Sequence, residues 1–277
     1  MSWRRIVGLL LLASLDVACG PIPMTLQDSE RETLYSQAMA LHLKGRLREA
    51  GRLYARLLEA DPPRPPTEEE QALVLRYAPR LFVTPQEPFP LLDVIAILHP
   101  ERPLIAYHLF WEDDIDYPED QEPCDHELVW VAYDPERGSV TGVYTYYHGQ
   151  ILDGTEAVAE AARHEGRPWI GVQWGKHGSL PYGWEAIGGG TVLQNMRRTY
   201  RRLSTEGHRL RNHPLAAGWP ATFTGTWEEF VDFSRLVDSR EWLRRERTIF
   251  VSRWGNAVLD QYALRYNFHP KLDWPDG

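Results

Sequence analysis

The sequence predicts an α+β fold: mainly an antiparallel β-sandwich, with a helical hairpin at the N-terminus and a helix near the C-terminus. Three observations predict this class. Short runs rich in Tyr, Trp and Val are separated by turn signals, which is typical of antiparallel sheets. Residues 28–62 space their apolar side chains as helices do. Of the 277 residues, 43% are hydrophobic and 12% are aromatic, which is enough to build a sizeable core.

Residues 1–19 have the organisation of a signal peptide. Arg4 and Arg5 precede an apolar run that is too short to span a bilayer. The run leads to Cys19, in a sequence that resembles a bacterial lipoprotein processing site with Cys19 as the lipid-bearing residue. Asp16 stands where such sites carry an apolar residue, so cleavage without lipidation and retention as an anchor stay open. We expect an extracytoplasmic protein of the cell envelope, attached to a bacterial membrane by its N-terminal lipid.

Residues 20–66 predict a helical hairpin that ends in a Pro-rich linker. Leu34, Ala38 and Leu41 share one helical face, Gly45 interrupts the pattern, and a second apolar run follows. The spacing resembles a single tetratricopeptide repeat. Because one repeat cannot build the concave groove of repeat arrays, we expect the hairpin to pack on the domain that follows it.

The stiff linker PPRPP at residues 62–66 marks the boundary of a second domain, residues 67–277. This domain is expected to be β-sandwich-like, with a helical insertion towards its C-terminal end. The expected strands cover residues 103–111, 127–134, 140–148, 168–175, 248–253 and 262–268. The expected helices cover residues 67–76, 155–164 and 226–246, with Thr67 and Thr226 as N-caps.

Charge and cysteine usage exclude some classes of function. The formal net charge of −9 argues against nucleic acid as a main partner. The sequence has two cysteines. If Cys19 carries a lipid, Cys124 has no disulfide partner, so we expect no disulfide framework. The neighbouring Asp125 would raise the pKa of the Cys124 thiol, which favours an inert thiol over a nucleophile.

The densest acidic stretch in the chain lies between two expected strands. Residues 112–127 contain nine carboxylates and no Lys or Arg. Asp125 and Glu127 are two positions apart on a strand and therefore project to the same face, where two carboxylates repel unless one is protonated or a cation lies between them. Asp113, Asp114, Asp116 and Glu122 could add oxygen ligands for a hard cation. The alternative is a solvated acidic loop.

Familiar catalytic motifs are missing from the sequence. His126 and Glu127 begin like a zinc-protease motif, but Trp130 stands where the second His is required. There is no G-x-S-x-G nucleophile elbow and no Gly-rich P-loop.

Three segments carry a resemblance to a known family. YAPRLFVTPQEPFPLLDV at residues 77–94, DHELV at residues 125–129 and WGKHGSLP at residues 174–181 resemble the vacuolar protein sorting sixty-two-like family. More distantly, the acidic element resembles the heptad of the necrosis- and ethylene-inducing-like proteins, which are secreted β-sandwich proteins that hold a divalent cation.

The resemblance implies a ligand set. The family Asp and Glu match Asp125 and Glu127, the upstream Asp matches Asp114, and Glu122 stands at the position of the ligating His. Because this set contains only oxygen donors, it implies Ca²⁺ or Mg²⁺. His177 matches the His of the third element and is an accessory candidate, together with His126, which replaces the heptad Trp.

The function that the sequence predicts best is a binding module. A cation in the acidic loop would recruit a glycan, a lipid headgroup or a protein through an open coordination position. One alternative is a metal-assisted hydrolase with Asp125 or Glu127 as base and His177 as acid. The other is a metal-free scaffold lipoprotein.

Overall fold

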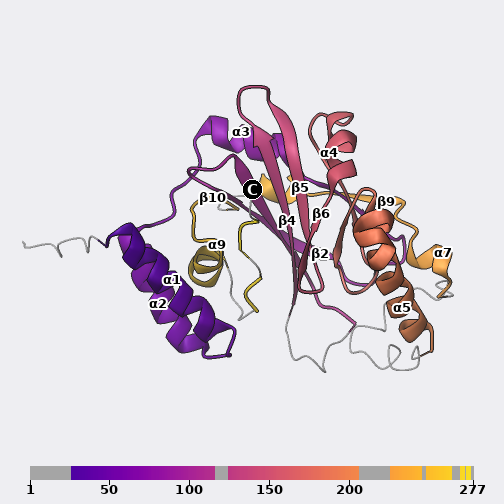
Figure 1. Ribbon diagram of the computed structural model, residues 1–277, viewed down its shortest axis with the longest axis horizontal. Helices are drawn as coiled ribbons and strands as arrows, with labels where there is room; N and C mark the ends of the chain where they lie inside the picture. Colours follow the sequence, from indigo (N-terminus) through magenta and orange to yellow (C-terminus); the bar gives the residue numbers. More distant parts are fainter. Residues whose placement is uncertain are drawn as a thin grey trace, which may run out of the picture.

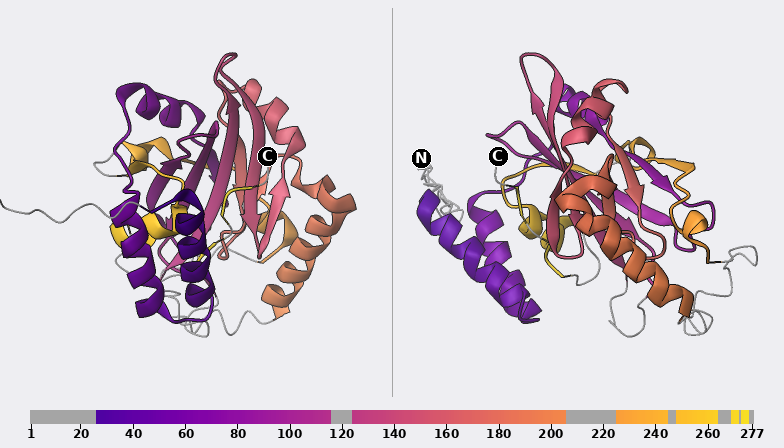
Figure 2. Two further views of the ribbon diagram at one scale, coloured as in Figure 1. Left: turned by 60° about the vertical axis from the view of Figure 1, so that its left-hand side comes forward. Right: turned by 45° about the vertical axis from the view of Figure 1, so that its right-hand side comes forward.

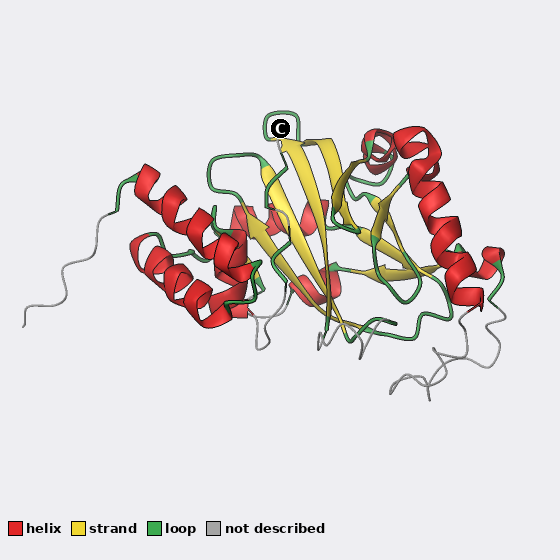
Figure 3. Ribbon diagram, turned by 60° about the horizontal axis from the view of Figure 1, so that its bottom comes forward, coloured by secondary structure: helices red, strands yellow, loops and turns green. Residues whose placement is uncertain are grey.

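The computed structural model of the chain describes residues 26–115, 124–205, 225–244, 248–263, 269–271 and 273–275. These residues form an α+β fold in which two mixed sheets pack together and helices lie around them (Figures 1 and 3). The predicted α+β class is confirmed. The antiparallel β-sandwich is confirmed only in part, because each sheet also contains a parallel pair: β1 with β7 and β2 with β10.

The larger sheet has six strands in the order β10–β2–β3–β4–β5–β6. Apart from the β10–β2 pair, its neighbours are antiparallel and follow one another along the chain. The strand bounds are Leu91–Leu98 for β2, Leu104–Trp111 for β3, Asp125–Asp134 for β4, Ser139–Tyr147 for β5, Gln150–Asp153 for β6 and Ile249–Val251 for β10.

The smaller sheet has four strands in the order β8–β7–β1–β9. Its strands are short and come from distant parts of the chain: Arg80–Val83 for β1, Trp169–Val172 for β7, Ser179–Pro181 for β8 and Arg235–Asp238 for β9. The main apolar core lies between the two sheets, because alternate residues of β1, β2, β3, β4 and β7 belong to one buried cluster.

Every residue of β3 is buried, which explains its sequence LIAYHLFW, apolar except for His108. The inward face of β3, which includes Ile105, Tyr107 and Trp111, joins the core between the sheets. The outward face is also covered: Phe110 packs with the N-terminal helices, and Leu104 packs against the C-terminal segment around Trp274.

The N-terminal hairpin consists of α1 (Asp28–His42) and α2 (Leu47–Ala60), with Gly45 at a φ of +68° in the turn. It lies beside the larger sheet, far from α5 (Thr191–Thr205) (Figures 1 and 2). The hairpin shares a buried cluster with β2, α9 (Gly255–Val258) and the turn after it, η3 (Leu259–Ala263). As expected, the hairpin packs on the domain that follows it.

Two of the next three helices along the chain lie where the sequence predicts helices. The predicted N-cap at Thr67 is confirmed, because α3 (Glu68–Tyr77) begins with a reciprocal Thr67–Glu70 capping box. Helix α4 (Thr155–Ala162) lies where a helix is expected. Helix α5 follows the 3₁₀ segment η1 (Trp184–Gly190) and was not predicted.

The prediction of one helix over residues 226–246 is wrong. Thr226 does cap a helix, but α7 (Trp227–Phe230) is short, and the chain then forms β9 before α8 (Arg240–Leu243). The reason is strand pairing, since β9 adds to the edge of β1 in antiparallel register. Of the strand expected over residues 262–268, residues 262 and 263 belong to η3 and the rest lie outside the described residues.

None of the helices in the described ranges is both long enough and apolar enough to cross a bilayer. Cys19 and the predicted signal peptide lie outside these ranges.

Candidate functional site

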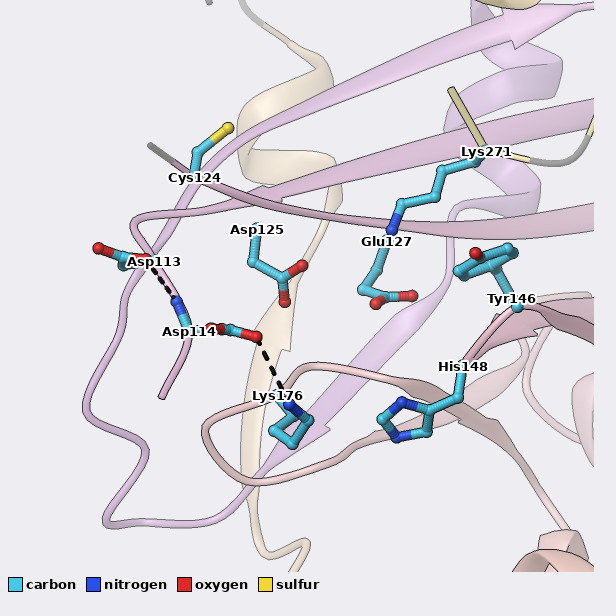
Figure 4. Close-up of a pocket in the computed structure, with 10 residues that line it drawn as sticks. Asp113, Asp114, Cys124, Asp125, Glu127, Tyr146, His148, Lys176 and Lys271 are labelled. Atoms are coloured by element: carbon cyan, nitrogen blue, oxygen red, sulfur yellow. Dashed lines mark hydrogen bonds and ion pairs between the residues drawn. The ribbon is translucent and has the colours of Figure 1, made fainter. Parts of the chain in front are cut away.

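A polar cavity of about 370 Å³ lies beside the first residues of β4 (Figure 4). Its volume is within the range of about 300–1,000 Å³ that is typical of small-molecule sites. Five segments of the chain contribute to it: the end of β3, the start of β4, the β5–β6 turn, the β7–β8 loop and the C-terminal segment. The lining residues are Asp113, Asp114, Cys124, Asp125, Glu127, Tyr146, His148, Gly149, Lys176 and Lys271.

Strand β4 places Asp125 and Glu127 in the cavity together. Its odd-numbered residues continue as Val129 and Val131, which belong to the core between the sheets. The two carboxylates therefore occupy the first two positions of the core-facing row of β4, as their spacing predicts. They are held in register with β3, where Trp111 pairs with Asp125.

His177 lies behind Asp125 and is fully buried. Its Nδ1 is 2.8 Å from Asp125 Oδ2, and its Nε2 is 3.1 Å from Glu87 Oε1. The ring stacks on Trp111 with a centroid distance of 4.4 Å and an interplanar angle of 5°. The backbone at His177 has a φ of +50°, which is unusual for a residue with a side chain and is typical of functional sites.

The environment of His177 makes it a buried imidazolium. Burial alone would lower its pKa, but the charges and hydrogen bonds of Glu87 and Asp125 outweigh burial and raise the pKa to about 10. With both ring nitrogens protonated, His177 donates one hydrogen bond to each carboxylate. Burial acts to raise the pKa of Asp125, but His177 overcomes it and lowers that pKa below its usual value.

Glu127 has the opposite electrostatic character. Burial raises the pKa of its carboxyl group to about 8; Lys271 opposes this shift, and the charge of Asp125 adds to it. Its Oε2 atom is buried and has no hydrogen-bond partner within the part of the chain that the structure describes. At neutral pH, the cavity therefore holds an ionised Asp125 beside a largely protonated Glu127.

Two lysines balance the acidic side chains of the cavity. Lys176 Nζ is 3.7 Å from Asp114 Oδ2. Lys271 comes from the C-terminal segment, and its ammonium group lies 4.6 Å from the ring centroid of Tyr146. Figure 4 shows the Lys271 side chain extending towards Glu127 from the side opposite Lys176. The cavity thus presents charges of both signs to a ligand.

His148 enters the cavity from a tight hairpin turn between β5 and β6. His148 and Gly149 have φ values of +46° and +83°, as a two-residue turn between antiparallel strands requires. His148 Nε2 is 2.7 Å from Gln173 Oε1, which fixes the orientation of its ring.

The structure brings some of the predicted site residues together and separates others. Asp114, Asp125 and Glu127 line one cavity, and His177 contacts Asp125 from behind. His126 projects from the opposite face of β4, where its Nε2 is 3.0 Å from His108 Nδ1. Glu122 lies outside the described residues. Within the described ranges, no three His, Cys, Asp or Glu side chains are arranged to hold a metal ion.

Sequence reasoning missed the residues that set the charge of the site. Glu87 is 90 positions from His177, and Lys271 lies in the C-terminal tail, far in sequence from β4. Glu87 does lie in the first of the segments on which the family resemblance rests, and Lys176 and His177 lie in the third. A search of those segments for opposite charges could have found Glu87 and Lys176.

Comparison with known proteins gave no match: no protein-family model, no curated protein and no solved structure matches the chain. The predicted resemblances to the vacuolar protein sorting sixty-two-like family and to the tetratricopeptide repeat therefore stay predictions.

Proposed function

We propose that the protein is a binding module whose polar cavity takes a divalent cation at the paired carboxylates Asp125 and Glu127. The observation that carries this proposal is the buried Oε2 atom of Glu127, which has no hydrogen-bond partner among the described residues and lies beside an ionised carboxylate. A buried polar atom without a partner is costly, and two adjacent carboxylates repel once both are ionised. A cation between them would remove both costs.

The donor chemistry suits a hard cation. Asp125, Glu127 and Asp114 are carboxylates that line the same cavity. They do not form a ready-made three-ligand site in the described ranges, so the proposal rests on the Asp125–Glu127 pair. Ca²⁺ accepts six to eight oxygen ligands, including water, and Mg²⁺ usually keeps several waters. A few carboxylates therefore leave positions open, through which the cation would contact a hydroxyl-rich or anionic group of a glycan, a lipid headgroup or a protein.

The proposal also includes a cellular location for the module. A lipid on Cys19 would hold the domain at the outer side of a bacterial membrane, within reach of envelope glycans and lipid headgroups. Mass spectrometry of the mature N-terminus tests this part separately. The expected result is a diacylglyceryl mass on Cys19 that the Cys19→Ser variant lacks, and an unmodified or uncleaved N-terminus would contradict it.

Thermal unfolding with and without cation tests the site. A ligand present at about one hundred times its Kd stabilises the folded state by about 2.7 kcal/mol, which for a chain of this size raises Tm by roughly 5–10 °C. We expect millimolar Ca²⁺, Mg²⁺ or Mn²⁺ to raise Tm relative to EDTA. Asp125→Asn and Glu127→Gln should abolish the shift, whereas Glu136→Gln, an exposed carboxylate on the β4–β5 turn, should keep it.

Two outcomes of the melting experiment would overturn the proposal. If none of the three cations shifts Tm, the metal-free scaffold is favoured. If Asp125→Asn and Glu127→Gln leave the shift unchanged, the cation binds elsewhere.

A metal-assisted hydrolase is the second candidate, favoured by the contrast between Asp125 and Glu127. A carboxylate and a carboxylic acid in one cavity, with pKa values moved apart by their surroundings, is the arrangement of a base and an acid. His177 does not fit the role of acid, because both ring nitrogens contact carboxylates and the ring is fully buried. Chromogenic ester and glycoside substrates test this candidate. Turnover that Asp125→Asn lowers by about 10²-fold or more would favour it over simple binding.

A further inference from the structure

A second cavity, of about 630 Å³, lies where helices α4, α5 and α7 meet strand β7 and the segment η1. We call it the aromatic cleft, because five aromatic side chains line it: Trp169, Tyr182, Trp184, Trp227 and Phe233. Its lining is distinct from that of the polar cavity beside β4. Its volume is within the usual range for a small-molecule site.

The rings of the cleft meet at steep angles. The Trp169 ring lies 6.0 Å from Tyr182 at 88° and 5.7 Å from Phe233 at 77°. Phe233 in turn lies 6.5 Å from Trp184 at 83°. Neighbouring rings are therefore close to perpendicular, which is a common packing of aromatic side chains. Apart from Tyr182, the rings that line the cleft are anchored in the hydrophobic cluster around Trp184.

The charged side chains of the cleft favour a cation. Glu156 and Glu185 contribute two negative charges and Arg197 one positive charge, which leaves a net charge of −1. The Arg197 guanidinium lies 5.3 Å from the ring centroid of Trp227, so one wall already binds a cation through its π face. Trp169, Tyr182 and Phe233 line the same cleft.

The absence of a side chain at Gly183 leaves space for the carboxylate of Glu156. Gly183 has a φ of +82°, and a Cβ added there would come within 2.7 Å of Glu156 Oε2. A side chain at this position would displace the carboxylate from the edge of the cleft. The cleft is thus lined by a carboxylate as well as by aromatic rings.

We propose that the aromatic cleft binds a small molecule that carries a quaternary ammonium group. Such a group has no N–H donor and a diffuse positive charge, so aromatic faces and a nearby carboxylate recognise it better than a single hydrogen-bond acceptor does. A primary ammonium ion is more strongly hydrated, so moving it from water to Phe and Trp walls costs more. This site is separate from the cation site of the proposed function, and each can fail without the other.

Calorimetric titration of the full-length chain with choline chloride tests the proposal, with NaCl as the salt control. The matched control ligand is 3,3-dimethylbutan-1-ol, the uncharged carbon isostere of choline. We expect saturable binding of choline in the millimolar range or tighter, and binding of the alcohol that is weaker by roughly two- to thirty-fold, the range that a cation–π contact accounts for. Equal binding of the two ligands, or no binding of choline, would overturn the proposal.

Variants locate the site. Tyr182 is 41% exposed, so Tyr182→Leu is expected to fold and to weaken choline binding by roughly two- to thirty-fold. Tyr262→Leu, at a ring that is 55% exposed and far from the cleft in sequence, should leave choline binding unchanged. Glu156→Gln should weaken binding of choline but not of the alcohol. If Tyr182→Leu and Glu156→Gln both bind choline like the parent chain, the aromatic cleft is not the site.

Vesicles distinguish the source of the ammonium group. Sedimentation with phosphatidylcholine vesicles, and with phosphatidylglycerol vesicles as control, uses the Cys19→Ser chain to remove any lipid anchor. Choline binding without sedimentation supports a free solute. Sedimentation with phosphatidylcholine alone, reversed by choline, supports the same chemistry on a lipid headgroup.

Discussion

On the inner face of β3 and β4, the imidazole of His177 lies between two carboxylates, whereas on the outer face of the same strands His126 lies beside a second imidazole, His108. Both clusters are buried. The inner ring stacks on Trp111, and the outer ring stacks on Phe110, one position away along β3, with a centroid distance of 4.6 Å. The two faces thus offer nearly the same packing and differ in their charged neighbours.

The difference shows what decides the charge of a buried histidine. On the outer face, burial lowers the pKa of His108 to about 3 and lowers the pKa of His126 well below its usual value. On the inner face, Glu87 and Asp125 reverse the effect of burial, and the pKa of His177 rises to about 10. The outer pair is buried and neutral, whereas the inner cluster places charge next to a cavity.

Replacing His177 is the most severe way to test this contrast. His177→Gln leaves Glu87 and Asp125 buried without their cation, which typically costs about 3–5 kcal/mol. We expect the free energy of unfolding from urea titration at pH 7 to fall by that amount. A loss below about 1 kcal/mol would mean that the inner cluster is no more charged than the outer one.

The pH dependence of stability in Glu127→Gln tests whether Glu127 is neutral in the folded chain. The pKa of Glu127 is raised from 4.5 to about 8 in the folded chain, so its stabilising protonation is complete below about pH 4.5 and is lost as pH rises through 8. The variant keeps a neutral side chain at every pH. We expect it to match the parent near pH 5 and to be more stable by about 3 kcal/mol near pH 8.

Urea titrations at several pH values, with Glu136→Gln as an exposed control, check the Glu127 prediction. Parallel stability curves for Glu127→Gln and the parent chain would show that Glu127 titrates normally.

His108→Gln should have the smallest effect, and its pH dependence should run in the opposite direction. Because the pKa of His108 is lowered from 6.5 to about 3, its contribution is complete above pH 6.5 and is lost as pH falls towards 3. At pH 7 the variant loses one buried hydrogen bond at a cost of about 1 kcal/mol. In acid unfolding followed by circular dichroism, its stability should fall less steeply than that of the parent below pH 6.5. A steeper fall would place a charge on the outer face.

The alternation of residues along one strand predicted the carboxylate pair. The rest of the site depends on contacts between residues far apart in the sequence, which the sequence did not predict. The alternation of β4 is a property of neighbouring residues, so the common face of Asp125 and Glu127 could be predicted from the sequence. The same alternation places His126 on the opposite face, so the prediction of His126 as an accessory site residue is wrong. The contact of Glu87 with His177 arises when the β1–β2 and β7–β8 loops meet, which no local period encodes.

The tail shows the same limit at the level of the fold. Thr226 has the signature of an N-cap and is one, but helix α7 ends at Phe230. The chain beyond it pairs with β1, and Asp238 at the end of β9 accepts a hydrogen bond of 2.6 Å from Arg167, which precedes β7. Tertiary pairing therefore overrides the helical pattern of residues 226–246.

The central claim is that Glu127 is a buried neutral carboxyl group that a divalent cation would ionise. Carbon-13 NMR of Glu-labelled protein tests it directly, with the Glu127 carboxyl signal assigned by its loss in Glu127→Gln. In EDTA, we expect a titration midpoint of about 8 for Glu127. Saturating Ca²⁺ should move the midpoint below neutral pH, because a bound cation favours the carboxylate. A midpoint near the ordinary value of 4.5 in EDTA would contradict the account.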